Sequence, residues 1–409
     1  MRYLLFIIFL CNASICSSQS KQAREHLSIL TSDSLAGRGY TDNGQEKASA
    51  FIVETLKKYQ VVAGGTSGFK QELSYPVNTF PASVQFSVDN QNTIKIYAAG
   101  KDYLFHSASA PVEIEGEIEQ ISVRKKIKSR ASDQIFYIEK TDSNSKEIEA
   151  LTQFFLFESK SKGNLLIIQD HSKWSWFPSP KQSDNTVLYV KDQLKNGTEI
   201  SAANESEFIS NFRSSNVIGK IEGRRRDSVI MFSAHYDHLG KMGSAIFRGA
   251  NDNASGVAML LALAKYYGEN QPEFDTYFLF STGEEIGLLG SYYFIENPPF
   301  DLRKIKMLIN LDMVGTGEEG ITVVNAKKNK RYFDLLQELN RGEISEIKER
   351  GTACNSDHCI FDQIGIPAVF IYTLGGKQAY HDVFDNGEGL SLEAFDELHD
   401  LLIESLDQY

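Results

Sequence analysis

From about residue 215 onward, near-continuous apolar runs alternate with stretches whose composition is typical of helices. The apolar runs are DSVIMFSA, TYFLFST, KMLINLDM and PAVFIYT. The helix candidates are SGVAMLLALAKYYGE, GLLGSYYFIEN, KRYFDLLQELN and LEAFDELHDLLIESL. Apolar runs of this kind suit strands that are covered on both faces. Their alternation with helices predicts an α/β fold, with a mostly parallel, twisted sheet flanked by helices.

The first half of the chain is organised differently. Residues 21–59 predict two helices, separated by the turn-rich segment LAGRGYTDNG. Between about residues 80 and 210, short runs predict strands separated by polar segments; these runs are VQFSV, TIKIYAAG, VEIEGEIEQISV, IFYIEK, FFLFES, GNLLIIQD and NTVLYV. We therefore expect residues 81–209 to form an inserted β-rich domain, and residues 19–80 and 210–409 to form the domain that surrounds it.

Two short segments stand out from this pattern. In the aromatic loop KWSWFPSPK, residues 173–181, Trp174 and Trp176 could touch a ligand, but aromatic residues beside prolines more often pack a loop onto its own domain. The basic run Arg224–Arg226 lies between two apolar segments, which predicts a solvated hairpin turn. With a net charge of -12, the chain is not suited to nucleic acid or to an anionic membrane surface.

The N-terminal segment MRYLLFIIFLCNASICSSQS has the order of a secretory signal, with a charged start, a short apolar centre and small residues at the exit. Its apolar run is too short to span a bilayer as a helix, and no other stretch looks transmembrane. We expect residues 1–18 to be a signal peptide cleaved near Ser18, and the mature protein to be secreted or periplasmic. Cys16 would suggest a lipoprotein, but Ile15 fits such signals poorly.

Two cysteines remain after this cleavage, Cys354 and Cys359, separated by Asn-Ser-Asp-His. Nearby thiols in an exported protein favour a disulfide. A metal-binding pair is the alternative, although one pair without a second is a weak zinc signal.

Polar side chains gather where the predicted strands end. They are His235, Asp237, His238, Glu284, Glu285, Asp312, Tyr380 and His381. One further acid, Asp252, lies just before the long apolar helix candidate. Ligands of open α/β sheets bind beyond the carboxyl ends of the strands, so we expect these groups to share one rim.

Except for the adjacent pair Glu284 and Glu285, each of these residues has an ordinary interpretation when it is taken alone. Asp252 would be a helix N-cap, Asp312 would start a turn with Gly315, and a single histidine is more often a satisfied polar residue than a ligand. Together they form a cluster of two histidines and four acids without nearby Lys or Arg. Two divalent cations would neutralise it, and nitrogen and oxygen ligands favour zinc, with cobalt or manganese as substitutes.

Several motifs together resemble the M28 family of dizinc exopeptidases, also called the aminopeptidase Y type. The motifs are SAHYDHLG, GANDNASGV, STGEEIGLLGS, NLDMVG, and SDHCIFDQIGIPAVF followed by YHDVFDN. The resemblance covers residues 215–409 closely, and SDSLAGRGYTDNGQEKASAFIVETLKKY fits the opening helices of the family. It implies the zinc exopeptidase fold, similar to that of phosphorylases and hydrolases. Members often carry an inserted protease-associated (PA-like) domain, of which GNLLIIQD is weakly reminiscent.

The resemblance also implies a ligand for each ion of a zinc pair. His235 and Asp312 would bind one zinc, Glu285 and His381 the other, and Asp252 both. It further implies a cis peptide bond after Asp252.

The remaining site residues receive supporting or catalytic roles from the same resemblance. Glu284 would be the general base that activates a water between the ions. Asp237 would orient the His235 ring, and Tyr380 could donate its hydroxyl to the developing oxyanion. Asp357 and His358 would support the site.

An exported zinc metalloexopeptidase that removes N-terminal residues from peptides is the resulting prediction. The alternatives are a glutaminyl cyclase on the same fold, which uses one zinc, and a carboxypeptidase or dipeptidase of the same family. A receptor ectodomain that has lost its metal-binding residues is disfavoured, because this chain has the full set of metal ligands. A serine hydrolase is disfavoured by the lack of a G-x-S-x-G motif. The expected partners are peptide substrates, with no nucleic acid and no integral membrane span. The preferred side chain and the oligomeric state do not follow from the sequence.

Overall fold

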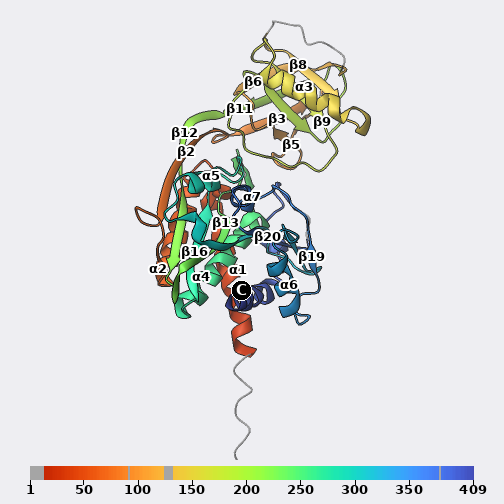
Figure 1. The fold of residues 1–409 in the computed structure, drawn as a ribbon. Coiled ribbons are helices and arrows are strands. Elements are labelled where there is room, and N and C mark those ends of the chain that lie inside the picture. The colour runs from red at the N-terminus through yellow and green to blue at the C-terminus, as the bar shows by residue number, and fades with distance from the viewer. Residues whose placement is uncertain (1–12, 91–92, 124–131, 377–378) are drawn as a thin grey trace, which may run out of the picture.

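The computed structural model describes residues 13–90, 93–123, 132–376 and 379–409. It consists of a large lower lobe and a smaller upper lobe, joined by two long strands (Figure 1). The lower lobe contains both ends of the described chain. The predicted signal peptide lies partly outside the described residues, and helix α1 (Ala13–Leu30) runs through the expected cleavage position near Ser18. Cleavage and the residue boundaries of the domains stay predictions.

The lower lobe is built on one twisted sheet. Its strand order is β1, β12, β16, β13, β17, β20, β18 and β19, with β2 pairing β12. The bounds are β1 Val62–Ala63, β2 Lys70–Thr79, β12 Glu207–Ile221, β13 Arg225–His235, β16 Phe274–Ser281, β17 Ile305–Leu311, β18 Ile321–Val324, β19 Ile347–Glu349 and β20 Ala368–Thr373. The four central strands β16, β13, β17 and β20 are parallel, which confirms the predicted mostly parallel α/β fold.

Helices cover both faces of this sheet. Their bounds are α2 Gly44–Lys58, α4 Gly256–Glu269, α5 Leu289–Glu296, α6 Lys330–Leu339, α7 His358–Gln363 and α8 Phe395–Gln408. On one face, α1, α2, α4, α6 and α8 share a core with Phe232 and Phe278 of the central strands. On the other face, Phe294 of α5 and Phe361 of α7 pack with Met231. Both faces are therefore dry, as the apolar strand runs predict.

The upper lobe contains two further sheets. One has the order β4, β3, β11, β6, and the other β5, β10, β9, β8, β7. The bounds are β3 Val84–Asp89, β4 Ile94–Ile96, β5 Tyr103–Phe105, β6 Val112–Glu117, β7 Glu119–Gln120, β8 Ile135–Glu139, β9 Leu165–Gln169, β10 Thr186–Val190 and β11 Glu199–Asn204. These sheets, which we call the inserted module, confirm the predicted β-rich insertion between two parts of the α/β fold.

One predicted strand of the inserted module is wrong. FFLFES begins inside helix α3 (Ser145–Phe157) and does not form a strand. The buried residues Ile148, Thr152 and Phe155 lie four and three positions apart, which is the spacing of one helix face. The helix ends in four consecutive apolar residues, which hide its helical spacing, because a short apolar run is compatible with a strand as well as with a helix.

The predicted hairpin at Arg224–Arg226 is also wrong in topology, although its three arginines are exposed. Strands β12 and β13 on either side of it do not pair with each other, because β16 lies between them. The turn therefore crosses over a neighbouring strand. In the described part of the chain, we find no helix with the length and apolar character that a membrane crossing requires.

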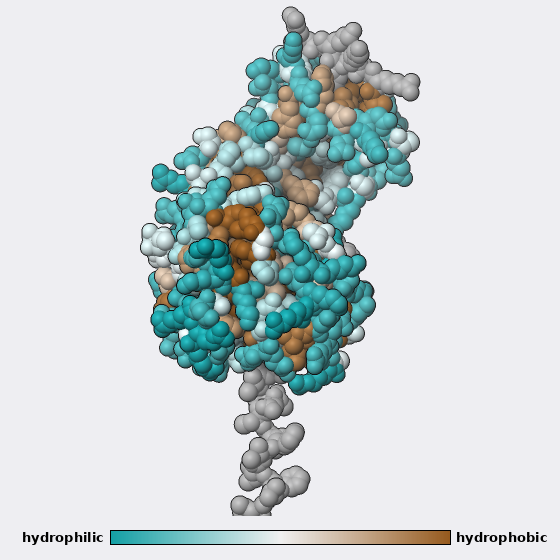
Figure 2. Space-filling model, viewed as in Figure 1, coloured by the Kyte–Doolittle hydropathy of each residue, from teal (hydrophilic) through white to brown (hydrophobic). Residues whose placement is uncertain are grey.

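The inserted module and the lower lobe share a hydrophobic core. Strands β2 and β12 pair from Lys70 to Thr79 and run from one lobe into the other (Figure 1). Leu239, Met242 and Phe247, in and beside the hairpin of β14 (Gly240–Met242) and β15 (Ala245–Phe247), pack into the core of the module. Figure 2 shows a mostly polar face with hydrophobic residues gathered at the junction of the lobes and just below it.

Candidate metal centre

The predicted site residues come together at the carboxyl edge of the central parallel strands. His235 is the last residue of β13, Glu284 and Glu285 follow β16, and Asp312 directly follows β17. His381 lies beyond β20, in the segment before α8. Because these four strands are parallel neighbours, their ends meet at one edge, as the sequence predicts.

Asp252 lies at the centre of this cluster. Its Oδ1 atom is 3.2 Å from His235 Nε2, and its Oδ2 atom is 3.0 Å from His381 Nε2. Each carboxylate oxygen therefore faces a different imidazole. The peptide bond between Asp252 and Asn253 is cis, as the family resemblance implies. Asp252 does not cap helix α4, which begins at Gly256.

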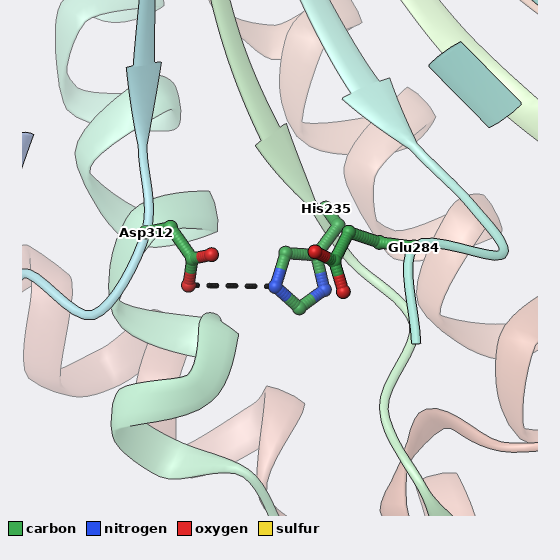
Figure 3. Close-up of side chains that lie close together, drawn as sticks. All are labelled: His235, Glu284 and Asp312. Carbon is green, nitrogen blue, oxygen red and sulfur yellow. Dashed lines mark ion pairs between the residues drawn. The ribbon is translucent and has the colours of Figure 1, made fainter. Parts of the chain in front are cut away.

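Each histidine also approaches a second carboxylate. His235 Nε2 lies 3.4 Å from Asp312 Oδ1, and His381 Nε2 lies 3.1 Å from Glu285 Oε2. The cluster thus divides into two halves that share Asp252. In the first half, Glu284 also contributes an oxygen within 4.8 Å of the His235 and Asp312 ligand atoms. Figure 3 shows Asp312 and Glu284 both turned toward the His235 ring.

The two adjacent glutamates point to different halves of the cluster. Gly283 precedes them with a φ of 64°, which lies in the left-handed region that glycine adopts readily. The chain can therefore turn sharply after β16. Glu285 is buried and contacts His381, whereas Glu284 is partly exposed and lies on the His235 side. This arrangement gives the two neighbouring carboxylates different places in the cluster.

Asp237 supports the cluster in a way that differs from the prediction. His235 Nδ1 lies 3.1 Å from the main-chain oxygen of Asp237, but 3.8 Å from its carboxylate. The ring is therefore oriented by a carbonyl group. The Asp237 carboxylate instead accepts the main-chain N–H of Glu284 at 3.3 Å. Asp237 consequently links the positions of His235 and Glu284.

Several buried partners of the predicted ligands receive no role from the sequence. Ser356 donates its hydroxyl to Asp312 Oδ2 at 2.8 Å, and Asn310 donates to Ser356 at 2.7 Å. His238 Nδ1 lies 2.5 Å from Glu285 Oε1. The Asp385 carboxylate accepts the N–H groups of Asn251 and Asp252 at 2.8 and 3.0 Å. Ser356 and Asp385 lie in the motifs of the family resemblance, which is the signal that points to them, and His238 also stands among the polar residues at the end of a predicted strand.

Arg38 is a further residue that the sequence analysis missed, in the turn-rich segment LAGRGY. It is fully buried, and its guanidinium donates to five main-chain oxygens. These belong to Leu30, Tyr236, Arg248, Gly249 and Asp252. Arg38 therefore fastens the loop after β13 to the loop that carries Asp252. A single Arg in a polar turn gives no sign that it will be buried.

The Asp357 and His358 pair supports the site from behind. Asp357 is buried and accepts the hydroxyl groups of Ser281 and Ser291. His358 Nε2 lies 2.9 Å from the main-chain oxygen of Ala353. Cys354 and Cys359, on either side of Asp357 and His358 in the sequence, form a disulfide, as their spacing favours.

Burial and charge shift the pKa values of the cluster in opposite directions. Burial raises the pKa of Glu284 well above its usual range, although the His235 imidazole opposes this and the neighbouring Glu285 adds to it. Burial would lower the pKa of His235, but the carboxylates of Glu284 and Asp312 hold it well above its ordinary value. For Asp252, hydrogen bonds from His235 and His381 outweigh burial and hold the pKa well below the usual range.

These residues fit divalent cations. Among the described residues, the ion pairs of Asp252, Glu285 and Asp312 involve histidines alone. Asp312 Oδ1 is buried, and within the same part of the chain it has no hydrogen-bond partner. The nearby cation, Arg38, directs its donors to main-chain oxygens. Imidazole nitrogens with carboxylates form the ligand set of zinc sites, and the two halves of the cluster, which share Asp252, offer two positions.

Tyr380 flanks the second half of the cluster. Its ring stacks on that of His381, with a centroid distance of 3.9 Å, and 39% of the residue is exposed. The structure therefore places Tyr380 at the solvent side of His381.

The fold and the site define the class of protein: an α/β domain with a candidate metal centre at the carboxyl edge of a mostly parallel sheet. Residues 216–406 match the model of peptidase family M28. This part of the chain belongs to that family.

Curated relatives with sequence similarity include aminopeptidase YwaD of Bacillus subtilis, which is 25% identical over 344 residues, covering 78% of this chain and 73% of the relative. The vacuolar membrane protease of Candida glabrata is 25% identical over 224 residues, covering 51% of this chain. The match spans only 23% of that relative's length.

Solved structures with a similar fold include a zinc aminopeptidase from Bacillus subtilis. It has a TM-score of 0.69 and 19% sequence identity, and the match covers 95% of each chain. An aminopeptidase from Aneurinibacillus sp. strain AM-1 has a TM-score of 0.65 and 19% identity, covering 96% of this chain and 95% of its own. The fold similarity therefore extends through the inserted module.

Proposed function

We propose that the chain is an exported dizinc aminopeptidase that removes N-terminal residues from peptides. The observation that carries this proposal is the position of Asp252, whose two oxygens face His235 and His381 in separate halves of one buried cluster. Membership of residues 216–406 in peptidase family M28 supports a peptidase. The names of similar proteins, among them aminopeptidase YwaD and a zinc aminopeptidase, support the aminopeptidase type.

The residues divide between two ions. His235 and Asp312 would hold one zinc, His381 and Glu285 would hold the other, and Asp252 would serve both. When bound, the ions supply positive charge that polarises a peptide carbonyl and lowers the pKa of water. Ser356 and His238 orient the Asp312 and Glu285 carboxylates, because partners of metal ligands fix the direction of their lone pairs.

Glu284 moves the proton. It lies on the His235 side, it is partly exposed, and its main-chain N–H is held by Asp237. Its carboxylate takes a proton from the attacking water and passes it to the leaving amine. A water that loses this proton attacks the peptide carbonyl, and the C–N bond then breaks as the amine receives the proton.

The acidic rim favours a substrate with a free amino terminus. The His381 half combines Glu285 and the shared Asp252, and the neutral form of the free amine would lie there with its nitrogen lone pair turned toward the ion that these residues would hold. Tyr380, exposed beside His381, donates its hydroxyl to the oxyanion that forms on the carbonyl.

Export rests on the N-terminal segment. The order of charged, apolar and small residues in MRYLLFIIFLCNASICSSQS supports a signal peptide and a secreted or periplasmic protein. The Cys354–Cys359 disulfide supports an oxidising compartment.

The test is hydrolysis of aminoacyl-nitroanilides by the wild-type protein and Glu284→Gln, with and without a chelator. We expect chelator-sensitive hydrolysis, two zinc ions per chain, and a loss of kcat of about 10²–10⁴-fold in Glu284→Gln with both zinc ions retained. Glu343→Gln, at an exposed position away from the cluster, is the matched control and should keep full activity. Full activity with one zinc per chain would refute the dizinc proposal, and a fully active Glu284→Gln would refute the mechanism.

A further inference from the structure

The inserted module reaches the candidate metal centre through one loop. This loop, residues 173–181, connects β9 to β10 and contains both tryptophans of the chain. The main-chain N–H of Trp176 donates to the main-chain oxygen of His381 at 3.0 Å. A residue of the module is therefore bonded directly to a residue proposed to hold zinc.

The loop is held firmly on both sides of this contact. The Trp176 side chain is buried, its indole N–H donates to the Phe105 oxygen at 2.9 Å, and its ring stacks on Phe247 with a centroid distance of 5.1 Å. The main-chain oxygen of Ser179 accepts the N–H of Asn78 in β2 at 2.8 Å. Packing of Trp176, which the sequence favours over ligand contact, thus fixes the residue that follows it.

That next residue, Phe177, is presented toward solvent at the site. Its ring lies 4.4 Å from the His381 ring, measured between centroids, in an edge-to-face arrangement. Phe177 is 49% exposed, whereas His381 is 3% exposed. Tyr380, also exposed, stacks on the same imidazole. Half of a large apolar ring therefore stays in contact with water at a position fixed by Trp176, next to a proposed ligand.

We propose that Phe177 contacts the substrate and sets its specificity, as an apolar wall for the side chain of the first peptide residue. This inference rests on the proposed function, because that function brings the free amine to the His381 half of the cluster. The side chain on the adjoining carbon then lies beside the rings that flank His381. A large apolar side chain removes the exposed part of Phe177 from water, so peptides that begin with Leu or Phe bind better than those that begin with Ala.

Binding can be measured apart from turnover, because both tryptophans lie in this loop. The experiment uses the zinc-loaded full chain with Glu284→Gln, and follows tryptophan fluorescence during titration with Leu-Gly, Phe-Gly and Ala-Gly. The same titrations are made with double variants that combine Glu284→Gln with Phe177→Ala or with Phe177→Leu. Phe154→Ala is the matched control, because Phe154 is an exposed phenylalanine of the same module, on helix α3.

We expect Phe177→Ala to weaken Leu-Gly and Phe-Gly binding about tenfold and Ala-Gly binding less than about twofold, with two zinc ions retained. Phe177→Leu should recover most of the loss, and Phe154→Ala should change nothing. In a protein that keeps Glu284, Phe177→Ala should raise KM for leucyl-nitroanilide with little change in kcat. Equal effects of Phe177→Ala on all three dipeptides, or none, would overturn the inference while leaving the peptidase proposal intact. A wild-type protein without zinc-dependent hydrolysis would instead refute the proposed function itself.

Discussion

Replacing Arg38 gives the sharpest test of how the loops of the site are held in place. Its guanidinium donates to five main-chain oxygens and is fully buried. Burial lowers the pKa of Arg38 to about 10, against the opposing pull of Asp385 and Asp252, so the group remains charged at neutral pH. Arg38→Met keeps much of the volume and removes every donor.

The magnitude follows from the buried carbonyl groups that lose their partners. A hydrogen bond to a charged group contributes about 1.5–3 kcal/mol, and breaking a buried charged network costs about 3–5 kcal/mol in total because the terms do not add. We expect Arg38→Met to lower the free energy of unfolding by about 4 kcal/mol. Arg38→Lys keeps the charge with three donors in place of five, so we expect a loss of about 2 kcal/mol.

Urea unfolding of the metal-free protein measures both losses. The control is Arg341→Met, because Arg341 forms an exposed ion pair with Glu404 and should cost less than about 1 kcal/mol. Competition with a chelator measures zinc affinity in the same variants. We expect the zinc affinity to fall in Arg38→Lys, because Arg38 donates a hydrogen bond to the main-chain oxygen of Asp252. An Arg38→Met protein within about 1 kcal/mol of the wild type would refute this account of the network.

Three further predictions concern the ligands and the pH dependence of stability. Glu285→Gln should lose one of two zinc ions, measured by metal analysis after dialysis; two retained ions would contradict its assignment. Ser356→Ala should weaken zinc binding about 10–100-fold, because Asp312 loses the hydroxyl that orients it at 2.8 Å. Zinc affinity is measured by competition with a chelator, and an affinity equal to that of the wild type would exclude this role. Burial, with Lys265 and Lys58, lowers the pKa of His26 from 6.5 to about 4, so the folded state favours the neutral ring. The stability that this shift contributes is present above pH 6.5 and is lost as the pH falls to about 4, and it amounts to about 3 kcal/mol. His26→Gln should therefore make the free energy of unfolding, measured in urea, less dependent on pH over that range. An unchanged pH dependence in the variant would contradict this role of His26.

The sequence predicts the centre of the site well, because the chemistry follows from topology. Parallel strands with apolar interiors bring their carboxyl ends to one edge, so His235, Glu285 and Asp312 had to meet there once the α/β pattern was recognised. The sharing of Asp252 and its cis peptide bond came from the family resemblance, since an acid before a helix is ordinarily a cap.

The supporting residues could not be predicted in the same way. The burial of Arg38 depends on five carbonyl groups from segments up to 214 positions away in the chain. Phe177 was overlooked because the sequence draws attention to the tryptophans beside it, and only the three-dimensional contact with His381 separates the anchoring residue from the exposed one. The helix at FFLFES was missed because local periodicity is ambiguous in short apolar runs.

The long pair of strands β2 and β12 has a consequence for how such a protein can be shortened or rebuilt. Thr79 and Glu207 are partners in one ladder, so the chain leaves the lower lobe and returns to it at neighbouring points. Joining them by a tight turn would delete the module without disturbing the central sheet. The shortened protein would, however, expose Met242 and Phe247, which are now buried under the module. A version without the module would therefore need a more polar hairpin at this position, so the module and the hairpin beneath it have to be redesigned together.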